Sequence, residues 1–207
     1  MRNAESMKMR EIGTRRAFLR AAVAVSAAVA FPTDVRAQDR GRPTPACGDS
    51  GLTPRQTEGP YYTPRTPMRA SLVETGMGGT RLVVEGVVLS AACTPIPNAL
   101  LDFWQADDRG EYDNAGYRLR GHQVTDERGR YRLVTIVPGN YPGRTRHIHV
   151  KVAAPGRSPL TTQLYFPDEP NNRRDGLYVP ELVMKVRDRP QEGKVGAFDF
   201  VLDVRSS

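Results

Sequence analysis

Short runs of β-branched and apolar residues, each closed by a turn containing Gly or Pro, recur through most of the chain. In the run RYRLVTIV, the side chains of Tyr131, Leu133, Thr135 and Val137 alternate with the intervening positions. Residues two apart lie on the same face of a strand, so this spacing predicts strands with one buried face. Such strands are expected at 81–90, 98–107, 129–137, 147–155, 160–167 and 198–204. Repeated short strands with intervening turns predict an antiparallel β-sandwich.

Helical periodicity is weak, and only PNNRRDG (170–176) and ELVMKVRD (181–188) are candidates for a short helix. The polar stretch at 118–129 is expected to be a solvated edge. The run GMGG (76–79) lacks the strand–turn–helix setting of a nucleotide-binding loop. The sequence therefore predicts a mainly β domain with long loops and little helix.

The first 37 residues have the features of a twin-arginine signal peptide. Arg15 and Arg16 precede a short apolar stretch at 21–31, and small residues at Val35 and Ala37 stand where a signal peptidase reads. The apolar stretch is too short to span a bilayer, which takes about 20 residues. We expect export to the periplasm or the extracellular space, with no membrane anchor left after cleavage. The mature domain is expected at 38–207, beginning with an extended lead-in at 38–60.

The net charge of the whole chain is +7. Part of that charge lies in the predicted leader, and the remaining basic residues are scattered rather than interleaved with aromatic residues. This distribution is typical of a solvated surface and indicates no nucleic-acid partner.

Two cysteines, Cys47 and Cys93, follow the leader. In an oxidising compartment an even count favours a disulfide, with two unpaired thiols as the alternative. Their separation excludes a CxxC-type metal site.

Two of the chain's three histidines, His147 and His149, stand in the stretch GNYPGRTRHIHVKV. On a strand, i and i+2 side chains share a face, so the two imidazoles point to one place. His122 is a candidate third ligand, which would give a three-histidine zinc site of the kind found in hydrolases.

The other nearby donors are phenols. A phenol has an ordinary pKa near ~10, so a strongly acidic cation is needed to hold it as phenolate. Two phenolates with two neutral imidazoles favour ferric iron.

Several stretches together resemble the intradiol ring-cleavage dioxygenases, a family of non-haem ferric enzymes. These stretches are TEGPYY (57–62), PIPNALLDFWQADDRGEYDN (95–114), TDERGRYRLVTIVPGNYPGRTRHIHVKV (125–152) and TTQLYF (161–166). The chain is similar to the compact protocatechuate-type subunit and to exported single-domain relatives. We therefore expect no long helical N-terminal region of the kind that the catechol 1,2-dioxygenases have.

The resemblance implies a role for each matching residue. Tyr112, Tyr141, His147 and His149 correspond to the ligands of one Fe(III). Arg144 corresponds to the arginine that stabilises charge on the substrate ring, and Tyr141 to the phenolate that leaves the metal and acts as a base. Gln163 corresponds to a residue lining the same pocket. Thr57, Gly59, Pro60 and Tyr61 correspond to a segment that closes over the substrate. Arg146 is expected to face away from the site, and Trp104 to lie in the core.

The family likeness implies cleavage of a catechol-type ring by O₂ to a cis,cis-muconate-type product. A second class remains open, because transthyretin-like and carboxypeptidase-associated sandwiches are non-catalytic binding modules. The identity of the catechol and the oligomeric state, including a homo-oligomer, are left open by the sequence.

Overall fold

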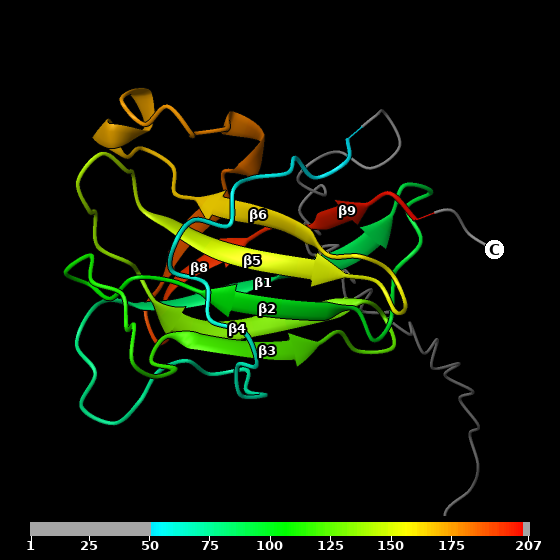
Figure 1. The fold of residues 1–207 in the computed structure, drawn as a ribbon, viewed down its shortest axis with the longest axis horizontal. Coiled ribbons are helices and arrows are strands. Elements are labelled where there is room, and N and C mark those ends of the chain that lie inside the picture. The colour runs from blue at the N-terminus through cyan, green and yellow to red at the C-terminus, as the bar shows by residue number, and fades with distance from the viewer. Residues whose placement is uncertain (1–50, 205–207) are drawn as a thin grey trace, which may run out of the picture. The chain divides into compact units, whose positions relative to one another are not determined.

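The computed structural model describes residues 51–204, and these residues form two β-sheets packed face to face (Figure 1). One sheet has four strands in the order β3-β2-β5-β6. The other has five, with the order β4-β1-β8-β7 and with β9 also paired to β1. The strands are β1 Arg81–Ser90, β2 Leu100–Trp104, β3 Arg120–Val124, β4 Arg130–Ile136, β5 His147–Ala153, β6 Leu160–Tyr165, β7 Lys185–Arg189, β8 Gly193–Ala197 and β9 Phe200–Leu202. The predicted β-sandwich is confirmed.

The four-stranded sheet is antiparallel throughout, but the five-stranded sheet is not. Strand β1 pairs antiparallel with β4 and parallel with both β8 and β9. Residues 82–85 of β1 face β8 and residues 88–90 face β9, so two consecutive short strands share one edge of β1. The expectation of a purely antiparallel sandwich is therefore wrong for these two pairs.

The sequence did not predict three of the strands, β3, β7 and β8. Strand β3 lies inside the stretch 118–129 that was expected to be a solvated edge. Its buried face carries Gly121 and Gln123 rather than β-branched residues, so it lacks the usual apolar signal. Strands β7 and β8 are rich in charge and glycine. Of the two candidates for a short helix, 170–176 contains a 3₁₀ turn, whereas 181–188 overlaps a 3₁₀ turn only at its first two residues and continues as β7. Helical structure is limited, among the described residues, to two 3₁₀ turns, η1 Pro170–Arg173 and η2 Pro180–Leu182.

Strand β5 has two chemically different faces. Ile148, Val150 and Val152 are fully buried in the hydrophobic core between the sheets. His147, His149 and Lys151 alternate with them and point to the opposite, outer face of the four-stranded sheet. Cross-strand partners share a face, and His149 is paired with Trp104 on β2 and with Gln163 on β6. The alternation of β5 thus carries both histidines out of the core and onto one outer surface.

The segment that follows residue 50 runs extended along the edges of both sheets. The Thr53 backbone N–H donates to the Val201 carbonyl of β9 at 3.0 Å, and the Gln56 N–H donates to the Thr161 carbonyl of β6 at 2.8 Å. Further along, the Met68 backbone bridges to His122 and the Ser71 backbone to Val134. The chain therefore crosses from one sheet edge to the other before β1 begins, and it passes over the outer face of the four-stranded sheet on the way.

The predicted leader at 1–37 and Cys47 lie outside the described residues. Cys93 is disulfide-bonded, while its pairing with Cys47 stays a prediction. No helix between residues 51 and 204 is long and apolar enough to span a bilayer.

Candidate metal centre

Four rings from three segments converge on the outer face of the four-stranded sheet. His147 and His149 begin β5, Tyr112 lies in the loop between β2 and β3, and Tyr141 lies in the loop between β4 and β5. The ring centroids are 4.7 Å apart for His147 and His149, 5.7 Å for Tyr141 and His147, 5.9 Å for the two tyrosines, and 6.3 Å for Tyr112 and His149. The structure thus brings all four predicted ligands together.

The two tyrosine-bearing loops are held against each other backbone to backbone. The Gly139 N–H donates to the Asp107 carbonyl at 2.7 Å. Gly110 has a φ of +86°, and a Cβ atom there would lie 2.2 Å from the Asn140 carbonyl oxygen. Only glycine fits this approach, because any side chain would force the loops apart. Gly110, two residues before Tyr112, therefore helps to fix the distance between the two phenols.

Hydrogen bonding sets the orientation of His147. Its Nδ1 lies 2.7 Å from the Thr145 carbonyl oxygen, so Nδ1 carries the proton and Nε2 presents a lone pair. That lone pair points at Nε2 of His149, 3.1 Å away. A backbone carbonyl that fixes the tautomer in this way is a common partner of metal-ligating histidines.

Burial keeps both imidazoles neutral. Desolvation, followed by the nearby Arg144 guanidinium, lowers the pKa of His147 to about 4. Burial also lowers the pKa of His149 well below its ordinary value, with further lowering from His147 and Arg144. At neutral pH both rings can therefore offer a nitrogen lone pair to a cation.

The phenol groups are protonated unless a cation binds them. Burial, and then the neighbouring Tyr141, raise the pKa of Tyr112 far above its ordinary value, and burial likewise raises the pKa of Tyr141. Among residues 51–204, the buried Tyr112 hydroxyl and the His149 Nδ1 have no hydrogen-bond partner. Buried polar atoms are nearly always paired, so an unpaired hydroxyl among three other donor rings fits a place for a metal ion. The donor set of two phenols and two imidazoles suits a ferric ion.

Arg144 lies beside the four rings and is held there by a carboxylate. Its Nε donates to both Asp175 oxygens, at 2.9 and 3.1 Å, and the two side chains are 12% and 1% exposed. Its terminal nitrogens lie 3.4 Å from the Tyr141 hydroxyl and 3.4 Å from the Tyr165 hydroxyl, and also contact Gln163. The structure therefore places Arg144 and Gln163 at the same site, as predicted.

Residues 57–62, which we call the cover segment, lie directly over the rings. Gln163 Nε2 donates to the Thr57 carbonyl at 2.9 Å. A Cβ atom on Gly59 would lie 3.5 Å from the His149 ring. The Tyr61 ring stacks on Tyr112 at 4.3 Å with an interplanar angle of 15°. Of the predicted segment, Thr57, Gly59 and Tyr61 meet the site directly, and Pro60 is exposed between them.

Trp104 is buried, as expected, but it lies on the outer face of β2 and is absent from the core cluster. Its indole stacks on His149, and the Tyr62 ring is tilted against it with the ring centroids 4.8 Å apart. The expectation that Trp104 belongs to the core and not to a site is wrong. The sequence carried a signal for this, because Trp104 alternates with the core residues Leu101 and Phe103.

His122 does not join the site. It is paired in register with Asp102 rather than with Trp104, and its Nδ1 lies 3.1 Å from the Thr66 hydroxyl. Within the described part of the chain no group of three His, Cys, Asp or Glu residues could hold a metal ion. The alternative of a three-histidine zinc site is therefore not supported. Arg146 turns away, as expected, and pairs with Glu169 at 3.0 Å.

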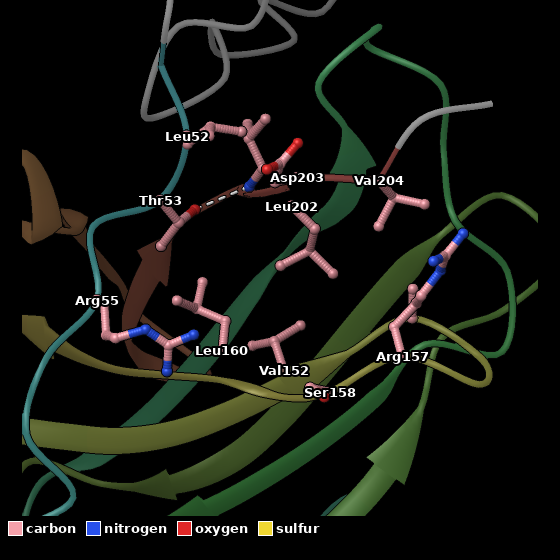
Figure 2. A pocket seen from close by; sticks show the side chains of 12 residues that line it. Leu52, Thr53, Arg55, Val152, Arg157, Ser158, Leu160, Leu202, Asp203 and Val204 are labelled. Atoms are coloured by element: carbon pink, nitrogen blue, oxygen red, sulfur yellow. Dashed lines mark hydrogen bonds between the residues drawn. The ribbon is translucent and has the colours of Figure 1, made fainter.

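A separate cavity of about 310 Å³ lies at the end of β5 and the start of β6, away from the two histidines (Figure 2). Its floor includes Val152, Leu160 and Leu202, and Arg55 and Arg157 extend from its sides. This cavity contains none of the four rings and does not border the site.

Comparison with known proteins agrees with the arrangement of these residues. A family model described as "Dioxygenase" matches residues 57–204. The chain belongs to the intradiol ring-cleavage dioxygenase family. It is 30% identical over 162 residues to a catechol 1,2-dioxygenase of Acinetobacter baylyi, covering 64% of this chain and 52% of that protein.

Solved structures of dioxygenases superpose on the chain. One is the dioxygenase domain of a dioxygenase carbohydrate-binding protein fusion from Streptomyces sp. SirexAA-E. It has a TM-score of 0.72 and 56% identity, covering 74% of this chain and 99% of that one. Another is 3-chlorocatechol 1,2-dioxygenase from Rhodococcus opacus, with a TM-score of 0.67 and 29% identity, covering 73% and 72%. The chain spans about half the length of the catechol and hydroxyquinol 1,2-dioxygenases that it matches, at 52% of each.

Proposed function

We propose that the protein is a non-haem Fe(III)-dependent intradiol dioxygenase that opens the ring of a catechol with O₂. The observation that carries this proposal is the convergence of Tyr112, Tyr141, His147 and His149, with an unpaired phenol hydroxyl among them. The overall change adds both atoms of O₂ to the diol, which gives a cis,cis-muconate-type dicarboxylic acid. No external reductant is required for this balance.

In this proposal, the two phenols and the two imidazoles hold one ferric ion per chain. The chemistry that the ion supplies when bound is to take the diol oxygens and draw electron density from the ring. His147 and His149 are neutral at physiological pH and need lose no proton to bind it. The Thr145 carbonyl keeps the lone pair of His147 at Nε2, which is the atom that faces the other imidazole.

Tyr141 is the residue that takes a proton from the substrate. It is half-buried on a short loop, whereas Tyr112 is more deeply enclosed beneath Tyr61. A phenolate oxygen at Tyr141 would be within 3.4 Å of an Arg144 nitrogen, so the same guanidinium can stabilise it before proton transfer.

Arg144 would also stabilise negative charge that develops on the ring. Its partner Asp175 fixes the guanidinium plane through two hydrogen bonds, which leaves the terminal nitrogens directed at Tyr141, Gln163 and Tyr165. A charge that is already in place before the reaction costs no reorganisation during it. Above the site, the cover segment would exclude water from the reacting ring.

The proposal includes export. In support, Arg15 and Arg16 precede the domain, small residues stand at the predicted cleavage position, and Cys93 is disulfide-bonded, which suits an oxidising compartment. The twin-arginine route carries folded proteins, so iron could be acquired before export.

An oxygen-uptake screen tests the proposed activity on purified protein loaded with iron. The substrates are catechol, protocatechuate, hydroxyquinol and chlorocatechols, and the products are identified by mass. We expect uptake of one O₂ per ring cleaved with at least one of them. A ferric ion bound by phenolates absorbs visible light. A colourless protein that consumes no oxygen would therefore favour the non-catalytic binding module instead.

A further inference from the structure

Arg120 is a fully buried cation that bonds to backbone rather than to carboxylates. It begins β3 and has 0% of its surface exposed. Its Nε and one terminal nitrogen donate to the Asp113 carbonyl at 3.1 and 2.7 Å, and its other terminal nitrogen donates to the Tyr61 carbonyl. Burying an arginine is costly unless its donors are satisfied, so this position has a specific structural demand.

The two carbonyls that Arg120 holds belong to two different parts of the site. Asp113 directly follows the candidate iron ligand Tyr112, and Tyr61 belongs to the cover segment. The rings of Tyr61 and Tyr112 are themselves stacked at 4.3 Å. Arg120 therefore holds the backbone of both segments that carry the two stacked rings.

Arg120 also shares a row with the rest of the site. It is paired in register with Trp104, which is paired in turn with His149 and stacks on it. The rigid sheet thus sets the position of the guanidinium relative to the histidines. The planar fork of arginine can reach two carbonyls at once, which a lysine ammonium at the end of a flexible chain cannot do as well.

We propose that Arg120 is a positioning residue that couples the cover segment to the loop carrying Tyr112, so that the two open and close as one unit. Opening the cover to admit a substrate would then shift the Tyr112 ligand, and a firmly held ligand would favour the closed cover. Only the iron-release part of the test below rests on the proposed function.

Hydrogen exchange measured by mass spectrometry on peptides covering 57–63 and 112–117 follows the two segments separately. Iron release to a chelator follows the ligand set. In Arg120→Lys, which keeps the charge but loses the fork, both peptides should exchange faster. Iron should leave about 10–100-fold faster, the usual scale for losing a partner that orients a metal ligand.

One control variant and one variant in the cover contacts separate coupling from general loosening. Arg130→Lys makes the same exchange at an exposed arginine paired with Asp126, and should leave every readout unchanged. Lys151→Met removes the 2.6 Å ion pair with Glu58 and the cation over the Tyr62 ring. Because the two segments open as one unit, it should speed exchange in both peptides while Arg120 is present, but in 57–63 alone when it is combined with Arg120→Lys. If Arg120→Lys leaves either peptide at the wild-type rate, the coupling is overturned.

The wild-type protein provides a test that needs no variant. Residues that open as one cooperative unit exchange with the same opening free energy and the same urea dependence. We expect the hydrogen-bonded amides of the two segments, Gly59 in the cover and Ala115 and Gly116 after Tyr112, to share both values. Different values would overturn the proposal even if Arg120→Lys fails to fold. If wild-type protein binds no iron, the proposed function fails, while the exchange data still decide the role of Arg120.

Discussion

Trp104 stacks almost parallel on His149, with ring centroids 4.7 Å apart and an interplanar angle of 9°. The two histidines of the site are therefore oriented by different means. His147 is fixed by a hydrogen bond from Nδ1 to the Thr145 carbonyl, whereas the Nδ1 of His149 has no such partner in residues 51–204. The plane of His149 is set by packing, between the indole and the backbone of Gly59.

We expect Trp104→Leu to weaken metal binding through His149. The smaller side chain would leave the imidazole free to turn, and iron release should speed up by about 10–100-fold. Trp104→Phe keeps a flat ring and should restore most of the retention. Phe103→Leu is the matched control, because it alters the next residue on the core side of the same strand. Chelator kinetics on the three variants decide this, and wild-type release in Trp104→Leu would contradict it.

The ligand assignment predicts a pattern across three variants. His147→Ala and His149→Ala should lose iron and visible colour together, because each removes one of four donors. Tyr141→Phe should retain part of the iron while turnover falls, since this phenolate is the one expected to leave when substrate binds. Iron content, the visible band and oxygen uptake are measured on the same samples. Full iron and activity in both histidine variants would refute the ligand set.

Arg144 and its partner Asp175 should separate charge stabilisation from iron binding. Arg144→Ala should keep iron and colour but slow turnover by about 10²–10³-fold, the scale for losing one preorganised charge. Asp175→Asn should keep the positive charge but misplace it, with a loss of about 10–100-fold. Steady-state rates at matched iron content provide the measurement. A colourless Arg144→Ala protein would place this arginine in metal binding instead.

Asp175 should also contribute to stability in a pH-dependent way. Burial alone would raise the pKa of this carboxyl, but the backbone N–H groups of Leu177 and Thr145 and the Arg144 guanidinium together lower it. A depressed folded pKa gives stability that is present above the unfolded value, near ~4, and is lost as pH falls through the folded value. Urea unfolding between pH 7 and pH 2 should therefore show a smaller acid loss in Asp175→Asn than in wild type.

The disulfide is expected to join Cys47 to Cys93 in the exported protein. It would tie the start of the domain to the turn between β1 and β2, and its loop predicts about 4 kcal/mol of stabilisation by chain entropy. Peptide mapping without reduction tests the pairing. Two thiols that react with an alkylating agent in native protein would rule it out.

Export predicts cleavage after Ala37. N-terminal sequencing of protein recovered from the cell envelope or the medium should begin at Gln38, and replacing Arg15 and Arg16 with Lys should retain the precursor in the cell. An intact Met1 on the exported protein would show that the leader assignment is wrong.

Sequence periodicity predicted the sandwich because most of its strands bury β-branched residues at every second position. It failed at β3, where Gly121 packs closely against the side chains of Arg69 and Leu72 and no apolar pattern results. The four ligand residues were found because they lie within a recognisable stretch. Asp175 and Arg120 were not, because each acts through contacts with residues more than 20 positions away or through backbone groups that carry no sequence signal.

The cover segment and the residues just before it are held by strands that are synthesised much later. Thr57 is held by Gln163, 106 residues further along, and Thr53 is held by Val201, 148 residues further along. During synthesis the beginning of the domain must therefore wait until nearly the whole polypeptide has left the ribosome. The ligand rings cannot be enclosed on a nascent chain, because β6 and β9 do not yet exist. Any metal captured in the closed site must be acquired by a completed protein, and truncation of the last strand should abolish that capture.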